Sequence, residues 1–115
     1  MNITIAGLGY VGTSIGILLS TKHKVICYDI DKNKLSLINK KKSPVKDPDI
    51  NNYLKNKNLD ISTTNSPKVA FSKSNFVIIC TPTNYDFTIN KFDTSSIEMV
   101  IKEVIQNNSK DAIIV

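Results

Sequence analysis

The chain has 115 residues, of which 41% are hydrophobic and 22% charged, values typical of one folded domain. Its net charge is +5, yet all 15 basic residues are lysines. Without arginine the chain lacks the planar fork that reads guanine edges and phosphates, and it shows no nucleic-acid motif, so we expect no nucleic-acid partner. No apolar run approaches the roughly 20 residues of a membrane helix, and Met1 leads directly into a strand-like segment. We therefore expect a cytoplasmic protein without a membrane segment.

Short apolar runs alternate with segments of helical periodicity along the whole chain. In chain order the pattern predicts strand 3–6, helix 10–20, strand 24–28, helix 31–40, short helix 47–55, strand 59–63, short helix 66–72, strand 75–80, loop 81–92, a helix from Asp93 or Thr94 to about 108, and strand 112–115. The apolar stripes are Val11, Ile15 and Leu18 on the first helix, Leu35 and Ile38 on the second, and Ile97, Ile101, Val104 and Ile105 on the last.

Strands that alternate with helices predict parallel strands joined by right-handed crossovers. The expected fold is a Rossmann-type, doubly wound α/β sheet of order 3-2-1-4-5 with helices on both faces. The fourth and fifth strands lack polar alternation, which fits a sheet covered on both faces.

A glycine motif follows the first predicted strand and opens the first predicted helix. Gly7-Leu8-Gly9-Tyr10-Val11-Gly12 has the spacing G-x-G-x-x-G, and this strand-to-helix context makes the motif informative. The first glycine would allow a tight turn, the second would let the backbone approach a pyrophosphate, and the third would let the helix lie close to the sheet. The helix N-terminus would offer N–H groups to the phosphates. A glycine-rich turn without a ligand is the alternative.

An acidic residue ends the second predicted strand. Asp29 stands 17 residues after Gly12, where dinucleotide-binding proteins place an acid on the adenosine ribose. Its charge would repel the 2′-phosphate of NADP, so the sequence favours NAD. Alternatively, Asp29 only caps the next helix, a role that Asp31 can also fill.

Two further sets of residues carry weaker signals. Thr81-Pro82-Thr83 follows the fourth strand at the same sheet edge, where its hydroxyls could bind a cofactor, although such a segment is also an ordinary loop entry. Cys27 and Cys80 lie at strand-like positions and are interpreted as small buried apolar residues. They form neither a disulfide framework nor a metal site, so we expect no metal.

These residues resemble the UDP-glucose/GDP-mannose dehydrogenase family, most closely its bacterial UDP-glucose 6-dehydrogenases, over the whole chain. The segments that carry the resemblance are the glycine motif with Asp29, Ser43-Pro44-Val45 with Ile50 and Tyr53-Leu54, Val77 to Tyr85 with its Thr-Pro-Thr-Asn-Tyr loop, and Phe92-Asp93-Thr94 before the last helix.

The resemblance implies an enzyme that oxidises C6 of UDP-glucose to the carboxylate of UDP-glucuronate, reducing two NAD. It implies cofactor contacts at Val11, Asp29, Lys34 and Thr83, which join Gly7, Gly9, Tyr10 and Gly12 as the candidate cofactor-binding residues. The family's catalytic residues, including its cysteine, lie farther along the chain and match nothing here, so we expect no catalytic residue within 1–115.

The same resemblance implies that 1–115 is an N-terminal NAD-binding domain that ends after its fifth strand, without the nucleotide-sugar domain. We expect this part alone to be inactive, its last strand to expose an edge, and the full-length enzyme to be a homodimer. Two alternatives stay open. One is a sibling enzyme acting on UDP-N-acetylmannosamine or GDP-mannose. The other is a non-enzymatic NAD-sensing module, against which the 43–57 segment and the 81–85 loop argue.

Overall fold

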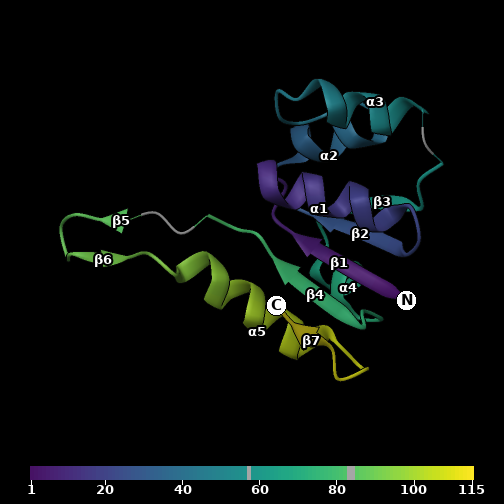
Figure 1. Ribbon diagram of the computed structural model, residues 1–115. Helices are drawn as coiled ribbons and strands as arrows, with labels where there is room; N and C mark the ends of the chain where they lie inside the picture. The colour runs from purple at the N-terminus through teal and green to yellow at the C-terminus, as the bar shows by residue number, and fades with distance from the viewer. Residues whose placement is uncertain (57, 83–84) are drawn as a thin grey trace.

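A five-stranded parallel sheet forms the centre of the molecule (Figure 1). The computed structural model describes residues 1–56, 58–82 and 85–115. The sheet order is β3-β2-β1-β4-β7, with strands β1 (Asn2–Ala6), β2 (Lys24–Tyr28), β3 (Ile61–Thr64), β4 (Phe76–Ile79) and β7 (Ile113–Ile114). Because β7 is the fifth strand of this sheet, the predicted order 3-2-1-4-5 is confirmed.

The segment predicted as the loop 81–92 contains two additional short strands. β5 (Tyr85–Asp86) and β6 (Lys91–Phe92) pair antiparallel. The Asp86 carboxylate accepts a hydrogen bond from the Thr88 N–H at 2.9 Å and so supports the turn between them. Figure 1 shows this hairpin well away from the main sheet. Strands of two residues are too short to show an alternating pattern, which is why the sequence did not predict them.

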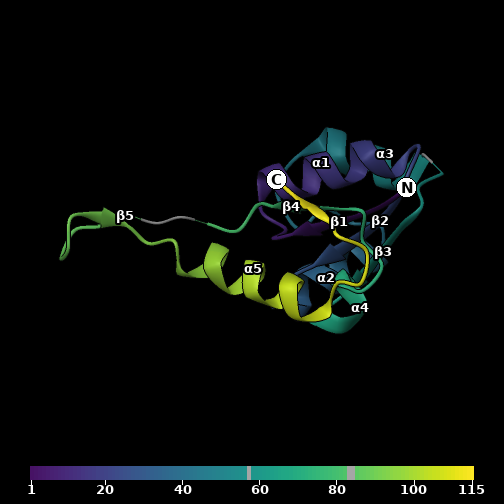
Figure 2. The ribbon, with the colours of Figure 1, turned by 90° about the horizontal axis from the view of Figure 1, so that it is seen from below.

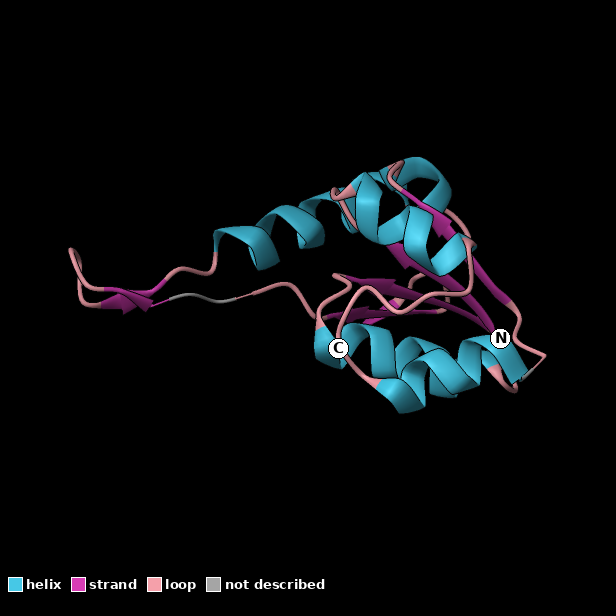
Figure 3. Ribbon diagram, turned by 90° about the horizontal axis from the view of Figure 1, so that it is seen from above, coloured by secondary structure: helices cyan, strands magenta, loops and turns pink. Residues whose placement is uncertain are grey.

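Helices cover the two faces of the sheet (Figures 2 and 3). One face packs against α1 (Tyr10–Ser20), α2 (Lys32–Asn39) and α3 (Pro48–Asn56) through a core that includes Ile5, Val25 and Leu54. The other face packs against α4 (Pro67–Phe71) and α5 (Ser95–Asn107) through a core that includes Phe71 and Val77. The parallel strands alternate their side chains between these two cores, as a doubly wound sheet requires.

The face that α1 turns to the sheet differs from the predicted stripe. Gly12, Gly16 and Ile17 are buried, whereas Val11 and Leu18 are 60% and 65% exposed. The small residues bring α1 close to the sheet, since a Cβ at Gly16 would lie 3.4 Å from Cys27 Sγ. A pattern search that weighs only large apolar residues misses a contact face made of glycine.

The other two predicted stripes have different outcomes. Leu35 and Ile38 of α2 are buried, as expected. On α5 the buried residues are Val100 and Val104, whereas Ile105 is 72% exposed, so the predicted stripe is rotated around that helix.

Strand β7 lies at the outer edge of the described sheet. Val115 N–H donates to Val77 O at 2.8 Å, while the side chains of Ile113 and Val115 are 56% and 67% exposed. Within the described residues, the side chains of β7 are therefore not covered on both faces of the sheet, contrary to expectation. None of the helices in the described ranges has the length and apolar character needed to cross a membrane.

Candidate cofactor site

A cleft of about 500 Å³ opens at the carboxyl ends of β1, β2 and β4. Its lining comes from the glycine turn, the end of β2, the end of β4 and one face of α5. The lining residues are Gly7, Leu8, Gly9, Tyr28, Asp29, Ile30, Asp31, Lys34, Cys80, Thr81, Pro82, Ser96, Met99, Val100 and Glu103. This is the edge at which open α/β sheets bind ligands. Of the predicted site residues, the cleft brings together Gly7, Gly9, Asp29 and Lys34.

The glycine turn holds β1 and α1 in close contact with β4. Gly7 has a φ of +102°, a conformation that residues with side chains rarely adopt, and a Cβ there would lie 2.8 Å from the Cys80 carbonyl. At Gly12, an added Cβ would lie 1.9 Å from Gly7 O. Both glycines are therefore required by packing within the protein.

Gly9 differs from its two neighbours in the motif. A Cβ built at Gly9 meets no protein atom within 4 Å, and the residue lines the cleft. Nothing in the described fold therefore requires a glycine at this position. The open space in front of Gly9 suits a ligand whose phosphates must approach the backbone.

The start of α1 leaves its backbone donors available to such a ligand. Gly9 is the N-cap and supplies no side-chain acceptor, and the first turn contains no acidic residue. The Tyr10 hydroxyl donates to Oδ2 of Asp47, the residue directly before α3, and this hydrogen bond lowers the pKa of that carboxyl. Val11 is exposed outside the cleft lining. Any contact of Tyr10 and Val11 with phosphate would therefore use their N–H groups.

Asp29 joins the end of β2 to the glycine turn. Its Oδ2 accepts the Leu8 N–H at 2.8 Å, and its Oδ1 accepts the Asp31 N–H at 2.8 Å. The cap of α2 is Asp31, whose side chain accepts the Asn33 N–H at 2.9 Å. Helix capping therefore does not explain why an acid stands at position 29. Each carboxylate oxygen of Asp29 also retains a lone pair that can accept a hydrogen bond from a ribose hydroxyl.

Two residues after β4 complete this side of the cleft. Thr81 Oγ1 is buried and has no hydrogen-bond partner among the described residues. An unpaired buried hydroxyl is costly, and a ligand in the cleft could satisfy it. Cys80 also lines the cleft, and burial raises the pKa of its thiol. Thr83, expected to contact the cofactor, lies outside the described residues.

The sequence did not predict the cleft residues that lie on α5. Ser96, Met99, Val100 and Glu103 share one face of α5, with the spacing i, i+3, i+4, i+7. That spacing was readable from the sequence, but only the tertiary fold shows that this face meets the ends of β2 and β4.

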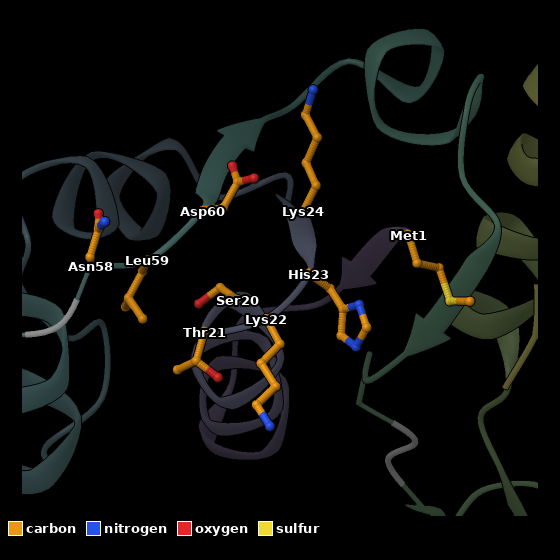
Figure 4. A pocket seen from close by; sticks show the side chains of 9 residues that line it. All are labelled: Met1, Ser20, Thr21, Lys22, His23, Lys24, Asn58, Leu59 and Asp60. Atoms are coloured by element: carbon orange, nitrogen blue, oxygen red, sulfur yellow. The ribbon is translucent and has the colours of Figure 1, made fainter.

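A second hollow of about 620 Å³ lies at the amino ends of β1, β2 and β3, at the end of the sheet opposite the cleft. Figure 4 shows that Lys22, His23, Lys24 and Asp60 extend from its rim in different directions. The charged groups do not converge on one point, so the hollow has the character of an open surface. Within the described ranges, no three His, Cys, Asp or Glu residues gather as a metal site would require.

The fold and the cleft together define a dinucleotide-binding domain: a glycine turn before a helix, an acid at the end of β2, and open space at Gly9. The chain belongs to the UDP-glucose/GDP-mannose dehydrogenase family, whose NAD-binding domain model matches residues 1–115. The cofactor of this domain is NAD, and the described site fits it.

Curated relatives of the chain include two bacterial UDP-glucose 6-dehydrogenases. The Streptococcus pneumoniae protein is 43% identical over 115 residues, and the Campylobacter jejuni protein is 41% identical over 117 residues. Both matches span all of this chain but only 29% and 30% of those proteins. The chain therefore covers less than a third of these relatives.

Solved structures give the same fold. A ternary complex of GDP-mannose dehydrogenase from Pseudomonas aeruginosa matches with a TM-score of 0.80 and 34% identity, over 90% of this chain and 24% of that one. A UDP-N-acetylmannosamine dehydrogenase from Pyrococcus horikoshii matches with a TM-score of 0.87 and 26% identity, over 99% of this chain and 27% of that one.

Proposed function

We propose that residues 1–115 are the N-terminal NAD-binding domain of a UDP-glucose 6-dehydrogenase. The observation that carries the proposal is the 43% identity to the Streptococcus pneumoniae enzyme over the whole chain. In the proposed reaction the C6 alcohol and one water become a carboxylate, while two NAD become two NADH and three protons are released. Bound NAD supplies the hydride acceptor in each of the two oxidations.

The residues of this chain would hold the cofactor. Gly9 and the first turn of α1 receive the pyrophosphate, and Asp29 accepts the ribose hydroxyls. The carboxylate of Asp29 already holds the Leu8 N–H at 2.8 Å, so one side chain would order both the glycine turn and the ribose. Lys34 and Thr83 remain proposed contacts, carried over from the family resemblance.

The rest of the enzyme would supply the chemistry. By the family resemblance, the catalytic cysteine and the nucleotide-sugar site would lie outside residues 1–115, and the chain covers only 29% and 30% of the two relatives. Residues 1–115 alone are therefore expected to give no turnover. The cytoplasmic location, the homodimer and the lack of a nucleic-acid partner form part of the same proposal.

The test is the stoichiometry of the full-length protein. With limiting UDP-glucose, absorbance at 340 nm should show two NADH formed per sugar, and the product should carry a carboxylate at C6. A parallel assay with UDP-N-acetylmannosamine and GDP-mannose tests the sibling activities, which the two solved structures keep open. Oxidation of one of these sugars without oxidation of UDP-glucose would reassign the substrate. NAD binding without oxidation of any of them would favour a sensor.

A further inference from the structure

The part of the cleft beyond Asp29 has a different character from the glycine turn. Ile30 and Met99 both line it, and they are 82% and 60% exposed, so their apolar surface is accessible to a ligand in the cleft. Pro82 and the buried Val100 add further apolar surface. Such a cleft suits a flat ring with apolar faces.

The order of groups along the cleft identifies that ring. When the pyrophosphate lies on the glycine turn and the ribose on Asp29, the next group of the dinucleotide is its adenine. Adenine would then lie beside Ile30 and the α5 residues Met99 and Val100. This placement rests on the proposed cofactor-binding role of Gly9 and Asp29.

One charged side chain faces this apolar part of the cleft from α5. Glu103 is half-buried and lines the cleft one turn after Met99. Its Oε2 accepts the Tyr28 hydroxyl at 2.8 Å. Among the residues that the structure describes, no donor reaches the other oxygen, Oε1, which leaves it able to accept a hydrogen bond.

Tyr28 fixes where that carboxylate lies. The residue is 6% exposed, and its ring packs edge-on against Phe71, with ring centroids 5.0 Å apart. Tyr28 is also the last residue of β2, and Asp29 follows it directly. The Tyr28–Glu103 hydrogen bond therefore ties α5 to the strand end that carries the expected ribose acceptor.

We propose that Glu103 recognises the adenine of NAD by accepting a hydrogen bond from its 6-amino group, with Tyr28 holding the carboxylate in position. Adenine carries a donor at this position, and a carboxylate is a strong acceptor. Glu103 is thereby assigned as a specificity-determining residue for the base, separate from the ribose discrimination assigned to Asp29.

The test compares two ligands and a set of variants of the full-length protein by calorimetry. The ligands are NAD and nicotinamide purine dinucleotide, in which hydrogen replaces the 6-amino group. The wild type should bind the purine analogue about tenfold more weakly than NAD, because a hydrogen bond to a charged group is lost. In Glu103→Leu this ratio should fall to about one, and in Glu103→Gln, which keeps a neutral acceptor, it should be intermediate.

Two further variants separate recognition from other effects. Asp60→Asn removes one negative charge in the second hollow, at the amino ends of the strands and far from the cleft. This variant should keep the wild-type ratio of the two affinities. Tyr28→Phe keeps the ring but frees the carboxylate, and it should reduce the ratio less than Glu103→Leu does.

The outcomes separate this proposal from the cofactor site itself. A wild-type ratio near one, or an unchanged ratio in Glu103→Leu, would overturn the role of Glu103 while leaving NAD binding intact. Equal weakening of both ligands in Glu103→Leu would also overturn it, since Glu103 would then act on the ribose or on the fold. Failure of the wild type to bind NAD would instead reject the cofactor site.

Discussion

Replacing Gly9 and Gly12 by alanine should separate ligand binding from folding within one motif. A Cβ at Gly9 meets no protein atom within 4 Å, and its φ of −76° suits any residue. Gly9→Ala should therefore leave the free energy of unfolding unchanged or raise it by about 0.4–1 kcal/mol, because alanine reduces the entropy of the unfolded chain. The methyl group would stand in the cleft at the proposed pyrophosphate site.

Gly12→Ala should instead lower the free energy of unfolding. Its Cβ would lie 1.9 Å from Gly7 O and 3.2 Å from Cys80 Cβ, and a backbone atom cannot move aside as a flexible side chain can. The helix and the turn must shift, at a cost of about 1–3 kcal/mol or more. The gain in helix propensity, about 1 kcal/mol, offsets only part of this cost.

Thermal unfolding with and without NAD measures both effects. NAD at 100 times its Kd should stabilise the wild type by about 2.7 kcal/mol. Gly9→Ala should be at least as stable as the wild type without ligand but lose at least about tenfold in NAD affinity, since charge-assisted hydrogen bonds to phosphate are weakened. Normal NAD affinity in Gly9→Ala, or unfolding of the apo form as early as in Gly12→Ala, would refute this assignment of roles.

Three other predictions follow from the cleft. Asp29→Asn should weaken NAD binding about tenfold in calorimetry and reduce the preference for NAD over NADP; an unchanged preference would remove Asp29 from the ribose site. Cys27, which is buried and has a pKa raised by burial to about 12, should resist iodoacetamide at pH 8, whereas Cys80 should react slowly and be protected by NAD; peptide mapping that finds no protection of Cys80 would place the ligand elsewhere. Burial and the Glu103 hydrogen bond raise the pKa of Tyr28 to about 12, above its usual value of about 10. Its contribution to stability is therefore present below pH 10 and lost as the pH rises to 12, so the difference in unfolding free energy between wild type and Tyr28→Phe should shrink over that range.

The sheet and the glycine turn were predictable because local signals agreed with the global fold. Each strand is short and apolar, the helices between them are periodic, and right-handed crossovers leave few possible orders. Gly7 and Gly9 lie in the predicted turn between β1 and α1, Gly12 lies in the first turn of α1, and Asp29 directly follows β2, as the pattern predicted; their contacts with a cofactor stay a prediction. Only the structure shows that Gly7 and Gly12 serve packing while Gly9 faces open space.

The features that the sequence did not predict depend on tertiary contacts. The buried face of α1 is set by how closely Gly12 and Gly16 let the helix approach, not by the positions of Val11 and Leu18. The cleft face of α5, including Glu103, depends on where α5 crosses the ends of β2 and β4. A hydrogen bond such as Tyr28–Glu103 joins residues 75 positions apart and leaves no local pattern.

The most direct test of the central claim is a calorimetric titration of the full-length protein with NAD and with NADP. The cleft at Gly9 and Asp29 predicts saturable binding of one NAD per chain, with NADP bound at least about tenfold more weakly because its 2′-phosphate meets the Asp29 carboxylate. Absence of NAD binding, or equal affinity for the two dinucleotides, would contradict the account.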